Sequence, residues 1–67
     1  MISKMLKEIL KAKNISQFKL ARDLNLSQSV VNNYCTGKRE PSLSVLISIC
    51  KVLNVSADYL LGLKDYE

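Results

Sequence analysis

The chain has no histidine and no tryptophan, and its 67 residues include only one proline, two glycines and two cysteines. Without histidine it lacks the side chain that most often serves as a general base and as a metal ligand. Neither paired carboxylates at a useful spacing, nor a glycine-rich phosphate loop, nor a cluster of metal-binding residues takes its place. We therefore expect a protein that is not an enzyme, with no catalytic residue, no metal and no cofactor.

Long apolar runs are also missing. No stretch approaches the roughly 20 apolar residues of a membrane span, and the lysine-rich N-terminus, with apolar residues at helical spacing, differs from a secretory signal. Cys35 and Cys50 each stand among apolar neighbours in a predicted helix, which favours packing as buried thiols over a disulfide or redox chemistry. These features predict a soluble cytoplasmic protein, with residues 1–67 forming a single domain around one modest core.

Acidic residues are scarcer than basic ones, six against ten, which gives a formal net charge of +4. The excess lies in the first part of the chain, where residues 1–26 carry six lysines or arginines and two acidic residues. Residues 43–67 carry two basic and three acidic residues. A basic surface suits nucleic acid, but lysines that merely solvate the outer faces of helices explain this pattern equally well.

One tripeptide pattern, asparagine then an aliphatic residue then serine, occurs at residues 14–16, 25–27 and 54–56. Asparagine tolerates the left-handed conformation that ends a helix, the aliphatic residue packs inward, and the serine oxygen caps the next helix. With Gly37 and Ser42 as further end and start signals, the pattern predicts an all-α fold without strands. We expect five helices at about residues 3–13, 17–24, 28–36, 43–53 and 57–61, followed by a tail at 63–67 that frays. In the fourth helix, the residues expected to face inward are Leu43, Leu46, Ile49, Cys50 and Leu53.

The second and third of these predicted helices are short, and only three residues join them. Two short helices connected in this way are typical of the helix-turn-helix, a motif that reads DNA. We place the motif at about residues 16–36.

The third predicted helix carries polar side chains on one face and apolar side chains on the other. Gln28, Ser29, Asn32, Asn33 and Thr36 fall within an arc of about 140°, while Val30, Val31, Tyr34 and Cys35 fill the opposite arc. The polar arc contains no charge, although 24% of the chain is charged. A glutamine or asparagine amide can bond to N6 and N7 of adenine, serine can bond to several bases, and Val30 at the border can meet a thymine methyl. The alternative is that these are simply small polar surface residues.

The chain resembles the phage repressor and Cro helix-turn-helix family at positions that stay in register along nearly its whole length. They are Ser16-Gln17, Leu20-Ala21, Leu24, Leu26-Ser27-Gln28, Val31, Tyr34, Gly37, Pro41-Ser42-Leu43, Leu46, Ile49, Leu53, Val55-Ser56 and Asp58-Tyr59-Leu60-Leu61-Gly62-Leu63. The resemblance implies a compact five-helix bundle of the lambda-repressor-like type, which binds the major groove with its third helix, usually as a two-fold dimer on a palindromic operator.

The resemblance also implies roles for single residues. Gln17 would bond to a backbone phosphate, and Gln28 would contact the first base. Asn33, Thr36, Lys38 and Arg39 correspond to further positions on the DNA side. With the polar arc included, the predicted base-reading set is Gln28, Ser29, Val30, Asn32 and Asn33. The predicted phosphate set is Gln17, Lys19, Thr36, Lys38 and Arg39, with Arg22 as an alternative to Lys19.

Three features depart from the family pattern. Asparagine stands where the family commonly has glycine at the joints, and it is the usual second choice for that geometry. Leu10 and Cys35 occupy the positions where many members place a buried arginine–glutamate pair, so both partners have become apolar together. Phe18 occupies a position that is usually charged and exposed, so it either folds back on the first helix or touches the DNA backbone.

These observations predict a sequence-specific double-stranded DNA-binding regulator, most simply a repressor, that is nucleoid-associated when bound to DNA. It would act as a weak homodimer on a pseudopalindromic operator, without a membrane or an evident small-molecule ligand. Apolar residues beyond the needs of the core, some of which would form the dimer contact, are Val45, Ile47, Val52, Tyr59 and Leu63. The alternative is an antitoxin or a protein-interaction adaptor that keeps the fold without reading DNA.

Overall fold

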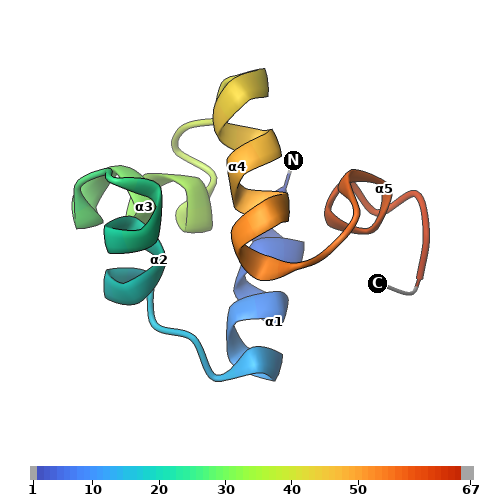
Figure 1. Cartoon of the computed structure of the whole chain (residues 1–67). Helices are drawn as coiled ribbons and strands as arrows, with labels where there is room; N and C mark the ends of the chain where they lie inside the picture. The colour runs from blue at the N-terminus through green and yellow to red at the C-terminus, as the bar shows by residue number, and fades with distance from the viewer. Residues whose placement is uncertain (1, 66–67) are drawn as a thin grey trace.

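The structure is a computed structural model that describes residues 2–65. Across that range it contains α-helices and no strand, as the sequence predicts. The five helices are α1 (Ser3–Lys13), α2 (Gln17–Leu24), α3 (Gln28–Thr36), α4 (Leu43–Leu53) and α5 (Ala57–Leu60). In the view of Figure 1, α2 and α3 lie on one side of α4, and α5 lies on the other.

The three Asn-aliphatic-Ser joints have one shared geometry. Asn14, Asn25 and Asn54 have φ values of 57°, 58° and 56°, all in the left-handed region. The next residue then donates its backbone N–H to a carbonyl five positions back, at 2.9 Å for Ile15, 2.9 Å for Leu26 and 3.1 Å for Val55. This bond satisfies a carbonyl that the end of the helix leaves without an intrahelical partner, so each joint closes one helix before the next begins.

The serine of each joint caps the following helix. Its Oγ accepts the backbone N–H three residues on, at 3.0 Å for Ser16, 3.2 Å for Ser27 and 3.0 Å for Ser56. Ser42 caps α4 in the same way at 3.3 Å. A serine cap stabilises a helix by about 1 kcal/mol relative to alanine, which matters for helices this short. The expected role of the pattern is therefore confirmed at all three joints.

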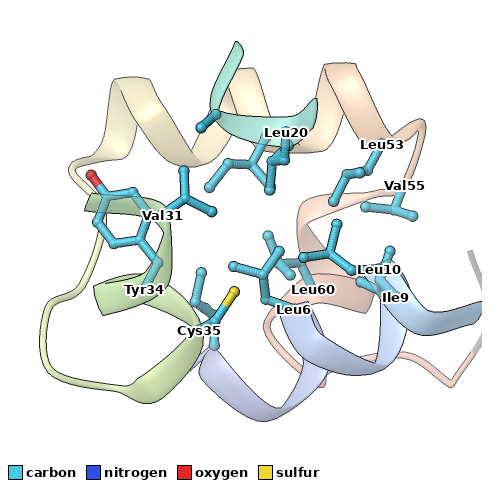
Figure 2. Close-up of a cluster of buried hydrophobic side chains, with 13 residues drawn as sticks. Leu6, Ile9, Leu10, Leu20, Val31, Tyr34, Cys35, Leu53, Val55 and Leu60 are labelled. Atoms are coloured by element: carbon cyan, nitrogen blue, oxygen red, sulfur yellow. The ribbon is translucent and has the colours of Figure 1, made fainter. Parts of the chain in front are cut away.

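One apolar core joins the helices. α3 packs against both α1 and α2, α2 packs against α4, and α4 packs against α5. Within residues 2–65 the core contains no polar or charged residue. Figure 2 shows part of this cluster, whose buried members are Ile2, Leu6, Ile9, Leu10, Leu20, Ala21, Val31, Tyr34, Cys35, Ile49, Leu53, Val55 and Leu60.

Leu10 and Cys35 both belong to this core, as their apolar character predicts. Leu10 is 5% exposed and Cys35 is fully buried, and burial raises the pKa of the Cys35 thiol. Figure 2 shows the sulfur of Cys35 directed toward Leu6, with Leu10 one turn further along α1. Direct contact between Leu10 and Cys35 stays a prediction. Cys50 is a free, half-buried thiol beside the core.

Two details of α4 and α5 differ from the prediction. Leu43, the first residue of α4, does not face inward as the sequence predicts, because its side chain is 73% exposed. α5 ends at Leu60 instead of Leu61. At the start of the expected tail, the backbone N–H groups of Leu63 and Lys64 both donate to the carbonyl of Asp58, at 2.7 and 3.3 Å, and fraying of the tail stays a prediction. Residues 66 and 67 of the expected tail lie outside the described residues.

Candidate nucleic-acid interface

α3 is held in place from two sides, because its apolar face packs against α1 and α2 at once. Val31 and Cys35 are fully buried and Tyr34 is 4% exposed. These three residues fall at one-turn spacing, so their burial sets the rotation of α3 about its own axis. The opposite face is therefore turned outward by the packing itself.

That outward face, which we call the polar face of α3, consists of Gln28, Ser29, Asn32, Asn33 and Thr36. All are exposed except Asn33, which is half-buried. Val30 lies at its border and is also half-buried. No lysine, arginine, aspartate or glutamate occurs anywhere from residue 27 to residue 37. A surface of this kind can donate and accept hydrogen bonds but cannot form an ion pair.

The side chains of the polar face differ in how far they are already engaged. The Ser29 hydroxyl lies 3.5 Å from that of Ser27, and the Thr36 hydroxyl donates to the carbonyl of Asn33 at 3.4 Å. The amides of Gln28 and Asn32 form no hydrogen bond with any other residue in the described part of the chain. Both amides therefore keep a donor and an acceptor for a ligand.

The first turn of α2 lies at the other end of the helix-turn-helix. Gln17 is half-buried there. The Lys19 ammonium donates to a carboxylate oxygen of Asp23 at 2.8 Å, one turn further along α2. The Lys19 hydrogen bond holds the pKa of Asp23 below its usual range. Arg22 lies 4.0 Å from the same carboxylate, so Lys19 and Arg22 already share one negative charge.

The loop after α3 carries two further cations close to the end of that helix. Gly37 ends α3 with a φ of 82°, and the backbone N–H of Arg39 then donates to the carbonyl of Asn33 at 3.2 Å. This bond keeps the loop folded against the last turn of α3. Lys38 and Arg39 are both exposed beside it.

Comparisons with known proteins agree with this arrangement. A family model described as helix-turn-helix matches residues 6–60, which include α2, α3 and the joint between them. The chain belongs to this helix-turn-helix family. The resemblance to phage repressor and Cro proteins that the sequence indicates is thereby confirmed.

Relatives of this helix-turn-helix chain occur in Bacillus subtilis (strain 168). The uncharacterized HTH-type transcriptional regulator YqaE is 39% identical over 61 residues, which are 91% of this chain and 53% of that protein. The HTH-type transcriptional regulator ImmR is 34% identical over 61 residues, 91% of this chain and 48% of that protein. The uncharacterized HTH-type transcriptional regulator YobD is 29% identical over 65 residues, 97% of this chain and 58% of that protein. The chain thus spans about half the length of these relatives.

Apart from the helix-turn-helix, the surface carries large apolar side chains that the core does not use. Phe18 on α2 is 61% exposed, so it does not fold back into the core. Ile47 and Val52 on α4 are 47% and 36% exposed, and Leu63 is 72% exposed. Val45 and Tyr59 are half-buried and pack against the core, so the exposed residues among those expected at the dimer contact are Ile47, Val52 and Leu63. None of the described helices is long and apolar enough to span a membrane.

Proposed function

We propose that this helix-turn-helix protein is a sequence-specific double-stranded DNA-binding transcriptional regulator that reads the major groove with α3. The uncharged polar face of α3 carries this proposal. An ordinary solvated helix face in a chain with 24% charged residues would include lysine or glutamate, whereas amides are suited to the donor and acceptor pattern of base edges. The relatives named HTH-type transcriptional regulators support a role in transcription.

In the proposed complex, bases and phosphates are contacted by different parts of the motif. Gln28, Ser29, Val30, Asn32 and Asn33 meet base edges, because the first turns of the second helix of such a motif enter the groove. Lys38 and Arg39 contact phosphates beside the end of α3, with Gln17 and Thr36 as uncharged partners. Lys19 is less suited to contact a phosphate, because it would first have to break its hydrogen bond with Asp23. We place all of these functions in one domain covering residues 1–67.

The assembly we propose is a weak two-fold dimer held by apolar side chains of α4 and by Leu63, which follows α5. Exposed Ile47, Val52 and Leu63 supply apolar area that the core leaves uncovered. A two-fold axis would place the two copies of α3 in successive major grooves, about 34–36 Å apart, on a pseudopalindromic operator. Repression then needs only that the dimer occupy the operator, so we propose a repressor that acts at the cytoplasmic nucleoid.

Selection of binding sites from a pool of random duplexes tests the proposal. The selected duplex and a scrambled duplex of the same composition would then be titrated with the protein at several salt concentrations. We expect the selected duplex to bind about a thousandfold or more tightly, and both affinities to fall steeply as salt rises. Equal affinity for the two duplexes, or no measurable binding, would overturn the proposal and favour the adaptor or antitoxin alternative.

A further inference from the structure

We infer that the half-site contacted by α3 is built mainly from A·T base pairs, which Gln28 and Asn32 recognise by direct contact with adenine in the major groove. The inference rests on the proposed function and adds to it the chemical class of the half-site. It follows from which side chains the polar face contains and from which it lacks.

Guanine and adenine present different hydrogen-bonding groups in the major groove, so different side chains recognise them. Guanine presents two acceptors, O6 and N7, and is read most often by the paired donors of an arginine or by a lysine. Adenine presents the N7 acceptor beside the N6 donor, which a glutamine or asparagine amide matches with one donor and one acceptor. The polar face of α3 offers amides and hydroxyls and no cation.

The cations of the helix-turn-helix and of the loop after it are poorly placed to supply the missing guanine contact. Lys38 and Arg39 follow Gly37, beyond the end of α3, whereas the first turn of α3 is the part that enters the groove. A nine-residue helix is about 13 Å long, so Gln28 and these two cations lie near its opposite ends. Arg22 is on α2 and faces Asp23 at 4.0 Å.

Gln28 and Asn32 are also free to act. Both are exposed, and among residues 2–65 neither amide has a hydrogen-bond partner that it would have to give up. The two residues are four apart and lie on the same side of α3, about 6 Å apart along the axis. That separation is close to two base-pair steps of about 3.4 Å each, so the two amides can serve neighbouring pairs of one half-site.

Val30 lies apart from these two amides. It is half-buried at the border of the polar face next to Asn33, about 160° around α3 from both Gln28 and Asn32. The match to an A·T pair therefore rests on the amides, whereas a G·C pair would leave guanine's second acceptor without a charged donor.

The test uses the operator selected from random DNA, with single base pairs replaced at the positions that prefer A·T. An inosine·cytosine pair keeps the minor-groove pattern of A·T but presents guanine's O6 and N7 in the major groove. A 7-deazaadenine·thymine pair keeps base pairing but removes the N7 acceptor. We expect each replacement to weaken binding by roughly 5- to 150-fold. The alanine variant that lacks the contacting amide, either Gln28→Ala or Asn32→Ala, should lose less than twofold in affinity when the same base pair is replaced.

A gain of function adds a second readout. Gln28→Arg should shift the preferred base at its position from adenine to guanine, because two donors then face two acceptors. A selected site with G·C pairs under the first turn of α3 would overturn the inference while leaving the proposed function intact. Tolerance of both replacements by the wild-type protein would also overturn it, since the A·T preference would then reflect DNA shape. Failure to select any site would remove the inference together with the proposed function.

Discussion

α3 and α4 use the same core in the same way, yet their outer faces differ. α3 buries Val31 and Cys35, and α4 buries Ile49 and Leu53, each exposed by 1% or less. Outside the core, α3 presents amides and hydroxyls, whereas α4 leaves large aliphatic side chains in water. The fold needs only the inner face of each helix. The outer face is free to meet a ligand, and we propose a different ligand for each helix: base edges for α3, and an apolar protein surface for α4.

The inner faces should be the most sensitive part of both helices, and Cys35→Glu is the sharpest test on α3. We expect this change to destabilise the protein by about 3–5 kcal/mol, because a carboxylate would be buried with no positive partner. Thr36 is the next residue along α3 and is exposed, so Thr36→Glu should lower the free energy of unfolding by less than about 1 kcal/mol. Urea denaturation measures both.

Adding Leu10→Arg to Cys35→Glu should recover much of the loss, because the two side chains would pair across α1 and α3. If the double variant is no more stable than Cys35→Glu alone, Leu10 and Cys35 do not stand in for the family's ion pair.

The outer face of α4 should govern assembly and leave base reading alone. Ile47→Asp removes a 47% exposed aliphatic side chain and places a charge in the proposed contact. We expect it to weaken dimerisation and full-operator binding by about 1–2 kcal/mol, with the affinity for a single half-site unchanged. Ser48→Asp puts the same charge on the neighbouring exposed residue and should have the smaller effect. Analytical ultracentrifugation measures dimerisation, and titrations of full and half operators measure the two affinities. Equal effects of Ile47→Asp and Ser48→Asp would exclude Ile47 from the dimer contact.

The loop after α3 should contribute affinity without specificity. Lys38→Ala should lower the slope of log affinity against log salt by about 0.9 for each copy that contacts a phosphate, on operator and scrambled DNA alike. Lys51→Ala, an equal loss of charge in the last turn of α4, should leave the slope unchanged. The two slopes come from titrations at four or five salt concentrations. A slope that stays the same for Lys38→Ala would place this loop away from the DNA.

Asp23→Asn should have the smallest effect, and it decides the role of Lys19. Removing the carboxylate frees the Lys19 ammonium from its 2.8 Å hydrogen bond, so the salt slope should rise by at most about 0.9 per copy if Lys19 then reaches a phosphate. Because Lys19 lowers the pKa of Asp23, the stability that this pair contributes is present above about pH 3.9 and is lost as the pH falls through the lower folded value. A titration at pH 7 therefore compares intact with broken pairs. No change in slope would exclude Lys19 from the phosphate contacts.

Local chemistry explains why most of the fold could be predicted from the sequence. The joints at Asn14, Asn25 and Asn54 depend on backbone conformation and on bonds to residues at most five positions away, so a short stretch of sequence determines them. The outward face of α3 followed from helical periodicity, because its buried and exposed residues separate cleanly.

What sequence could not predict depends on tertiary contacts, which helical periodicity does not contain. Leu43 has the same one-turn spacing to Leu46 as other core residues, so periodicity alone places it on the inner face, yet its side chain is 73% exposed. The pairing of Lys19 with Asp23 was visible as a favourable i, i+4 spacing, but its consequence for the phosphate set became clear only from the 2.8 Å contact. The DNA contacts themselves stay predictions.

The most direct test of base reading by α3 is the ratio of operator affinity to scrambled-DNA affinity for Gln28→Ala and Asn32→Ala, measured beside the wild-type protein and Ile47→Ala. We predict that each amide change lowers this ratio by roughly 5- to 150-fold, which corresponds to about 1–3 kcal/mol, while the affinity for scrambled DNA stays the same. Ile47→Ala should leave the ratio for a single half-site unchanged. If the amide changes lower the affinity for operator and for scrambled DNA equally, or lower neither affinity, α3 does not read bases.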